Sequence, residues 1–195
     1  MKNLFYTIIS ETEDLALLVV DNTGVLFYAS LGRSASSLVE VMLKDFKNTQ
    51  LYRLNSLKSA SSKLVSGKEM VSINETLDKY RQIMKDAGAV DKNAISIPIK
   101  IIFGTPLQRK VWDFLIQKLP YGTTTTYLDV AKSLNMPTAS RAIANCVGAN
   151  NIALVIPCHR VIAKSGKLNG YRWGVDIKKK ILQEELGDGY STLIK

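Results

Sequence analysis

The chain has 195 residues, 46% hydrophobic and 22% charged, which suits one medium or two small globular domains and argues against disorder. Its net charge of +9 suits a polyanionic partner without identifying one, since many basic proteins only carry a solvated lysine-rich surface. Two cysteines, Cys146 and Cys158, cannot form a disulfide framework, and a single histidine leaves too few ligands for a recognisable zinc spacing. We see no signal-peptide core and no membrane-length apolar run, and therefore expect an intracellular protein with no membrane partner.

The first half predicts a small supporting domain. Leu15–Val20 and Val25–Ala29 are apolar, strand-like runs on either side of the turn sequence Asp21–Gly24, which predicts a β-hairpin. Apolar residues recur at helical spacing from Leu38 to Phe46, and a more polar second helix is expected over Ile73–Met84, ending near Gly88. Up to Asn93 the chain has no cysteine, histidine, phosphate-binding loop or acidic cluster with metal spacing.

A boundary between two domains is expected near Asp91–Ser96. The alternating isoleucines of Ile95–Phe103 predict a strand or an extended crossing into the second half. We therefore divide the chain into an N-terminal supporting domain of mixed α/β structure with an antiparallel sheet, residues 1–94, and a mostly helical C-terminal domain, residues 95–195. The whole chain falls in the α+β (α/β) fold class.

Three helices are predicted in the second half. Thr105 is placed to cap a helix that has Pro106 in its first turn, Gln108 three positions after the cap, and an end before Pro120. Thr126 precedes a short amphipathic helix over Tyr127–Asn135, in which Asp129 supports the cap. Pro137 opens another helix, and two short helices joined by a tight turn predict a helix-turn-helix. The apolar positions of the last helix are Ala139, Ala142, Ile143, Cys146 and Val147.

The opposite face of this last helix carries small side chains and one long cation, which would let it approach a duplex backbone closely. These residues are Ser140, Arg141, Ala144, Asn145 and Gly148. An ordinary surface helix beside a core would have the same pattern, so the face alone does not establish DNA binding.

A reactive cysteine is predicted after this helix. The apolar run from Asn150 to Ile156 predicts a strand that delivers Pro157, Cys158, His159 and Arg160 to its end. A thiol becomes a good nucleophile when its proton is removed, and an adjacent imidazole held by a carboxylate can do this at neutral pH. A buried packing cysteine beside a satisfied histidine is the alternative for an isolated Cys-His pair.

The wider pattern resembles the O6-alkylguanine-DNA alkyltransferase family. The resemblance rests on the Pro157–Arg160 run, the following Val161-Ile162, a predicted hairpin over Ser165–Asn169 and the Gly170–Gly174 stretch, and it extends from Phe103 to Glu185. By this resemblance, Cys158 accepts the alkyl group, His159 is a water-linked base, and a glutamate on the closing helix orients the histidine. The family pattern selects Glu185, which helical geometry also places on the buried face, while periodicity leaves Glu184 open.

The resemblance also implies roles in binding DNA. Tyr127 crowds the target phosphate, Arg141 fills the stack vacated by the flipped base, Asn150 is a hinge, and Tyr171 covers the flipped guanine. The remaining residues expected to contact DNA or substrate are Arg160, Ser140 and Ala142.

The implied function is repair by direct damage reversal. A flipped O6-alkylguanine, chiefly O6-methylguanine, transfers its alkyl group once and irreversibly to Cys158, without cofactor or metal. The implied partner is double-stranded DNA, bound through the minor groove without sequence specificity by a monomer. The compartment would be the nucleus in a eukaryote and otherwise the cytoplasm. The preferred alkyl group and activity on O4-alkylthymine stay open, because pocket width depends on packing around Tyr127, Ala153, Asn169 and Tyr171.

Two other functions would use parts of the same sequence. A cysteine hydrolase using Cys158 and His159 would require an oxyanion hole, for which the sequence offers no motif. A lesion-binding protein or helix-turn-helix regulator without chemistry at Cys158 would bind DNA and stay unmodified.

Overall fold

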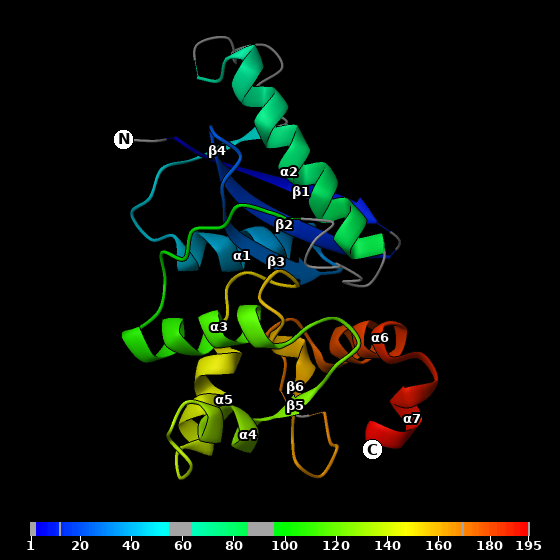
Figure 1. The fold of residues 1–195 in the computed structure, drawn as a ribbon. Helices are drawn as coiled ribbons and strands as arrows, with labels where there is room; N and C mark the ends of the chain where they lie inside the picture. The colour runs from blue at the N-terminus through cyan, green and yellow to red at the C-terminus, as the bar shows by residue number, and fades with distance from the viewer. Residues whose placement is uncertain (1–2, 12, 55–63, 86–95, 169, 195) are drawn as a thin grey trace. The chain divides into compact units, whose positions relative to one another are not determined.

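The computed structural model describes residues 3–11, 13–54, 64–85, 96–168 and 170–194. The chain forms two compact units, one built from residues up to Lys85 together with the segment that ends at Ile102, the other from Phe103 onward (Figure 1). Over the described ranges, no helix has both the length and the apolar character needed to span a membrane.

The first unit is built on a four-stranded sheet with the order β3-β2-β1-β4. Strands β1 (Leu4–Glu11), β2 (Asp14–Asp21) and β3 (Leu26–Gly32) pair antiparallel, and the short β4 (Leu51–Arg53) pairs parallel with β1. The predicted hairpin is confirmed as β2 and β3. Strands β1 and β4 were not predicted; β1 alternates half-buried and buried positions along most of its length, as expected of a strand with one face on a core.

The turn between β2 and β3 explains why the hairpin forms here. Asp21 Oδ1 accepts hydrogen bonds from the backbone N–H groups of Thr23 and Val25, which closes the turn. Gly24 has a φ of +78°, and its carbonyl accepts a hydrogen bond from Thr76 Oγ1 on α2. A Cβ at this position would collide with the backbone of α2, so only glycine fits.

Two helices complete the first unit. The expected helix over Leu38–Phe46 is present as α1 (Ala35–Asp45), capped by Ser34. The second, α2 (Gly67–Lys85), begins at Gly67 rather than at Ile73. Its early start is explained by Glu69, whose carboxylate accepts hydrogen bonds from the backbone N–H and hydroxyl of Ser66. The predicted end near Gly88 lies outside the described residues.

The segment before the second unit packs with the first. Leu26 of β3 forms an isolated parallel bridge with Ile99, in which Leu26 N donates to Pro98 O at 2.8 Å and Lys100 N donates to Leu26 O at 2.9 Å. The stretch is extended, as expected, but the division between units falls at residues 102 and 103 rather than at 94 and 95. These two backbone hydrogen bonds join the segment to the edge of the sheet at β3.

The second unit is mostly helical. Its main helices are α3 (Pro106–Lys118), α4 (Tyr127–Ser133), α5 (Ser140–Gly148), α6 (Val175–Leu186) and α7 (Tyr190–Leu193). Its short elements are β5 (Thr125–Thr126), β6 (Val161–Ile162) and the 3-10 turns η3 (Cys158–Arg160) and η4 (Gly187–Gly189). Strands β5 and β6 pair in parallel, which ties the segment before α4 to the segment after Cys158.

The caps predicted for α3 and α4 are confirmed. Thr105 and Gln108 form a reciprocal capping box, and Thr126 accepts a hydrogen bond from Asp129 N. Helix α5 begins at Ser140 instead of Pro137, because the preceding residues form a turn in which Ala139 N donates to Met136 O.

The inner face of α5 differs from the prediction at one position. Ile143, Cys146 and Val147 are buried, whereas Ala142 is exposed. Ala142 therefore lies on the exposed side of α5, where the contact with DNA implied by the family resemblance remains a prediction.

The strand predicted over Asn150–Ile156 is wrong. These residues form a compact turn, in which Ile156 N donates to Ile152 O and Leu154 has a φ of +65°. An apolar run indicates that a segment is buried, but it does not say whether the segment is a strand. Here the segment is a buried turn, and hydrogen bonds within the turn replace those of a sheet. The hairpin expected over Ser165–Asn169 is reduced to a turn, closed by a hydrogen bond from Gly166 N to Ala163 O, because β6 pairs with β5; Asn169 lies outside the described residues.

Candidate active site

Cys158 lies at the start of η3, directly after the buried turn. Its side chain is 4% exposed, and Cys158 N donates to Ile156 O at 2.8 Å. Proline at 157 has a φ of −80°, within the range that its ring imposes, and so helps to fix the approach to the cysteine. The thiol is thus held on a short, rigid segment with little freedom to move.

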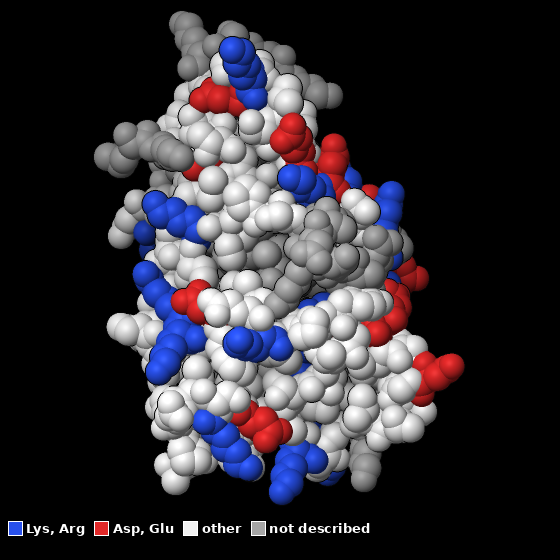
Figure 2. All heavy atoms as spheres, in the orientation of Figure 1, with Lys and Arg blue, Asp and Glu red and all other residues white. Residues whose placement is uncertain are grey.

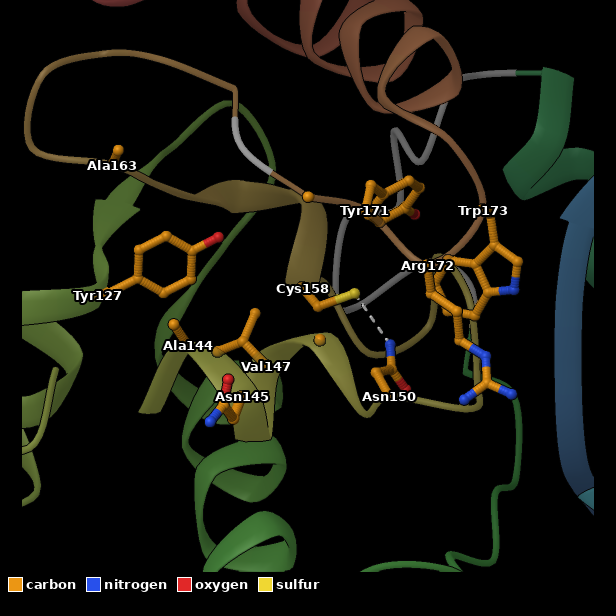
Figure 3. A pocket seen from close by; sticks show the side chains of 12 residues that line it. Tyr127, Ala144, Asn145, Val147, Asn150, Cys158, Ala163, Tyr171, Arg172 and Trp173 are labelled. Atoms are coloured by element: carbon orange, nitrogen blue, oxygen red, sulfur yellow. Dashed lines mark hydrogen bonds between the residues drawn. The ribbon is translucent and has the colours of Figure 1, made fainter. Parts of the chain in front are cut away.

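Asn150 organises this turn from its other end. Its side chain is 1% exposed and makes four hydrogen bonds. Nδ2 donates to Ile152 O, Ile156 O and Cys158 Sγ at 3.2, 3.1 and 3.1 Å, and Oδ1 accepts from Ile152 N at 2.8 Å (Figure 3). One buried amide therefore closes the turn and contacts the sulfur, which gives the predicted hinge residue a clear structural position.

The surroundings of Cys158 have opposing effects on the pKa of its thiol. Burial raises the pKa of the thiol to about 11, because an apolar environment penalises the thiolate. The hydrogen bond from Asn150 and the positive charge of Lys178 act in the opposite direction and lower this pKa. Ionisation therefore requires a proton acceptor inside the site.

His159 and Glu185 form a buried pair beside the thiol. His159 Nε2 lies 2.9 Å from Glu185 Oε1, and both side chains are fully buried. The structure thus selects Glu185 over Glu184, which is exposed. Arg160 donates through Nε and Nη2 to the two oxygens of Glu185, both at 2.8 Å, and through Nη1 to Leu119 O at 2.9 Å.

These contacts fix the protonation states. Burial raises the pKa of Glu185, but the hydrogen bonds and charges of His159 and Arg160 outweigh it and hold this pKa below its ordinary value. Burial lowers the pKa of His159, and Glu185 only partly offsets this effect. The ring is therefore neutral at neutral pH, and because an ionised carboxylate can only accept, Nε2 carries the hydrogen. Nδ1 is left as an acceptor, buried and without a hydrogen-bond partner among the described residues.

A cavity of about 550 Å³ opens onto the thiol (Figure 3). Tyr127 lines it from α4, Cys158 from η3, and Tyr171 from the loop before α6, where its ring meets that of Trp173 edge to face at 5.0 Å. The other lining residues are Ala144, Asn145, Val147, Gly148, Asn150, Ala163, Gly170, Arg172 and Trp173. Mostly apolar walls with a few polar groups around a nucleophile suit a flat, aromatic ligand. Ala153, predicted to influence the width of this cavity, is buried but does not line it.

The outer face of α5 is only partly turned to the cavity, which Ala144, Asn145 and Gly148 line. Arg141 and Ala142 are exposed and Ser140 is half-buried, and none of the three lines the cavity. Figure 2 shows lysine and arginine side chains on the drawn face of the second unit, including the region over α4 and α5. A small-residue face with a projecting cation beside the cavity fits the approach of a polyanionic duplex.

One predicted DNA-binding residue has a different position. Arg160 is predicted from the sequence to contact DNA, but its side chain is only 7% exposed, and its guanidinium donates to Glu185 and to Leu119 O. It supports the carboxylate that orients His159. Within the run Pro157–Arg160, no periodic pattern in the sequence distinguishes an arginine that contacts DNA from one that binds a buried carboxylate.

Two contributors were not identified from the sequence. Lys178 on α6 is 1% exposed and donates through Nζ to Val161 O at 2.8 Å. Its place one turn before Leu182, on the buried face, could have revealed it. Tyr121 places its ring under the Arg160 guanidinium, 5.9 Å from ring centre to Cζ, and donates through its hydroxyl to Glu184 O at 3.3 Å.

The described residues contain no group of three or more His, Cys, Asp or Glu side chains arranged to hold a metal ion. The expectation of chemistry without metal or cofactor stays a prediction.

The chain matches proteins of one family along its whole length. It is 53% identical to the methylated-DNA–protein-cysteine methyltransferase of Scheffersomyces stipitis, over 100% of this chain and 99% of that protein. The chain belongs to the methylated-DNA–protein-cysteine methyltransferase family. The enzyme of the same name from Candida albicans is 40% identical over 95% of this chain and 98% of its own length.

Two further comparisons agree with this family. Residues 106–187 match the family model described as "6-O-methylguanine DNA methyltransferase, DNA binding domain". The Mycobacterium tuberculosis OGT solved in complex with DNA has 26% sequence identity and a TM-score of 0.68, over 97% of this chain and 98% of that one. The α+β fold class predicted from the sequence is confirmed by this similarity in structure.

Proposed function

We propose that this protein repairs DNA by direct reversal, moving the alkyl group of an O6-alkylguanine onto Cys158. The observation that carries the proposal is the buried Cys158 at the floor of an apolar cavity, next to a His159–Glu185 pair whose free imidazole nitrogen faces no protein partner among the described residues. Membership of the family and the likeness to a DNA complex support it.

The transfer is a single displacement. The thiolate of Cys158 attacks the alkyl carbon, so that a sulfur–carbon bond forms as the carbon–oxygen bond to O6 breaks, and the bonding pair passes into the guanine. The guanine takes up a proton and leaves as the repaired base. The product is a thioether, which no group in the site can reverse, so each protein molecule acts once.

His159 is the proposed base. Its Nε2–H is held by Glu185, which leaves Nδ1 to receive the thiol proton. No direct hydrogen bond joins the thiol to the ring among the described contacts, and a water molecule between Cys158 Sγ and Nδ1 would carry the proton across. Arg160 holds the carboxylate so that the pair keeps its geometry.

Reaching the lesion requires base flipping, because O6 lies within the stack. In the proposal, α5 enters the minor groove with its small-residue face, Arg141 fills the vacated position, and Tyr127 and Tyr171 enclose the extruded guanine. Binding through backbone contacts gives little sequence preference, which suits scattered lesions. We further propose that the protein acts as a monomer, in the nucleus of a eukaryote or otherwise in the cytoplasm.

The proposal is tested by following the base itself. A duplex with one O6-methylguanine is incubated with equal or limiting protein, then digested to nucleosides and resolved by chromatography. We expect O6-methylguanine to be replaced by guanine up to one equivalent of protein and no further, with no conversion by Cys158→Ala. A lesion-binding protein would bind this duplex and leave the base unchanged, and a regulator would bind lesion-free operator DNA equally well.

A further inference from the structure

Lys178 is a buried cation that has no carboxylate partner among the described residues. Its side chain is 1% exposed, and the contact made by Nζ is the 2.8 Å hydrogen bond to Val161 O. Glu185, the buried carboxylate of the same helix, is engaged by His159 and Arg160. Burying an ammonium group with only a neutral acceptor is costly, so this arrangement is unusual for a purely structural lysine.

The position of Lys178 relates it to the nucleophile. It lies on the buried face of α6, and the carbonyl that it binds belongs to β6, which follows η3 and Cys158 directly. Burial lowers the pKa of Lys178 to about 8, and negative charge on Cys158 raises this pKa again. The positive charge of Lys178 reciprocally lowers the pKa of Cys158. The two groups therefore stabilise each other's charged forms.

The other charged groups of the site do not replace this role. Arg160 is neutralised by Glu185, and His159 is neutral until it takes the thiol proton. Tyr127 lies across the cavity, and burial together with the charge of Cys158 raises its pKa, which keeps it neutral. Transfer of the proton from Cys158 to His159 leaves an anion on the sulfur and a cation on the ring. The charge of the ring is held by Glu185, and Lys178 is a further buried cation whose charge favours the thiolate.

We propose that Lys178 is a positioning residue whose ammonium group is the buried counterion of the Cys158 thiolate. The inference rests on the proposed function only in taking that thiolate as the nucleophile. A purely structural lysine would instead tie α6 to β6 through its hydrogen bond to Val161 and leave the ionisation of Cys158 unchanged. The two roles separate when charge and hydrogen bonding are varied independently.

Three variants separate these roles. Lys178→Arg keeps a charge and donors, Lys178→Gln keeps a donor without charge, and Lys178→Met keeps only the apolar stem. The rate at which iodoacetamide modifies Cys158 is measured by peptide mapping between about pH 6 and pH 11 in full-length protein. Cys146, buried at 6% exposure on α5, reports in the same digest whether a variant has opened.

The counterion role predicts a charge-dependent result. We expect the pH profile of Cys158 modification to move up by about one unit in the Gln and Met variants, which below the midpoint is an about tenfold slower modification at a given pH, and transfer from O6-methylguanine at neutral pH to slow about tenfold. The Arg variant should recover most of both. Unchanged midpoints in the neutral variants, with Cys146 still protected, would overturn the inference. If Met does not fold, the comparison of Gln with Arg decides.

The iodoacetamide assay contains no DNA, so it separates the two proposals. A shifted midpoint in a protein that never accepts a methyl group would remove the proposed function and keep the counterion. Normal methyl transfer by the wild-type protein, with no shift of the midpoint in the neutral variants, would keep the proposed function and remove the counterion role of Lys178.

Discussion

Glu185 presents Oε1 to His159 Nε2 at 2.9 Å, with both side chains excluded from solvent. The same carboxylate accepts two hydrogen bonds from Arg160, so its geometry is fixed from two sides. An ionised acceptor at Nε2 leaves the lone pair of the neutral ring on Nδ1, the nitrogen that our account uses as the base.

Glu185→Gln tests this geometry. Glutamine keeps the shape but loses the charge, which leaves Arg160 buried without its anion. We expect transfer to slow by about 10²-fold and the free energy of unfolding to fall by about 3 kcal/mol. Single-turnover kinetics and denaturant unfolding measure the two effects. Glu184→Gln, an exposed neighbour on the same helix, is the matched control and should change neither. A folded Glu185→Gln protein that transfers at the wild-type rate would contradict the role of the pair.

The pH dependence of stability follows from His159. Burial lowers its pKa in the folded state, so below the ordinary value of 6.5 the unfolded chain binds a proton that the folded protein resists. Stability due to this group is therefore fully present above pH 6.5 and is lost as the pH falls toward the folded pKa. Urea unfolding of wild type and His159→Gln between pH 7.5 and 5 should show a steeper decline in wild type. Parallel curves would mean that His159 is not held neutral.

Asn150→Ala should loosen the turn that carries Cys158. The substitution removes hydrogen bonds to two buried carbonyls and one buried N–H, with an expected loss of at least about 2 kcal/mol in the free energy of unfolding. In the wild-type protein the hydrogen bond from Asn150 Nδ2 to the sulfur lowers the pKa of Cys158. The substitution removes this bond, so modification of the thiol should require a higher pH. Asn145→Ala, at an exposed asparagine on α5, is the control for stability. Equal stabilities of the two variants would refute the assignment.

Arg141→Ala should affect duplex DNA selectively. If Arg141 fills the space left by the flipped base, its loss should slow transfer from a duplex about tenfold, while transfer from a single-stranded oligonucleotide with the same lesion should change little. Lys110→Ala removes an exposed charge from α3 and controls for the loss of one cation. A similar loss on both substrates would indicate phosphate binding rather than a role in flipping.

The sequence could predict the elements whose signals are local. Thr105 and Gln108 mark the start of α3 through a capping box, and the Asp21–Gly24 turn marks the β2–β3 hairpin, because both depend on residues a few positions apart. The resemblance to the alkyltransferase family predicts Cys158, His159 and Glu185, and a buried helical face supports Glu185 as well. The structure brings the last two into contact.

Other features depend on tertiary contacts that no local pattern encodes. The run before Cys158 has a strand's composition, yet the Asn150 side chain closes it into a turn. The alternating isoleucines before Phe103 give no sign of their partner, which for Ile99 is Leu26 of β3, so the described part of this segment belongs to the first unit. From the sequence Arg160 is expected on the surface in contact with DNA, whereas in the structure it is buried and donates to Glu185. In each case the hydrogen-bond partner of a backbone group, or the partner of a charged side chain, is a residue that no local sequence pattern indicates.

The most direct test of the central claim is the mass of the protein after reaction. Wild-type protein is incubated with a duplex that contains one O6-methylguanine, and the intact mass and the peptides carrying Cys158 and Cys146 are then measured. We expect one added methyl group per molecule, found on Cys158 alone, with none on Cys158→Ala. A protein that binds the lesion and keeps its original mass, or that carries the methyl group on Cys146, would contradict it.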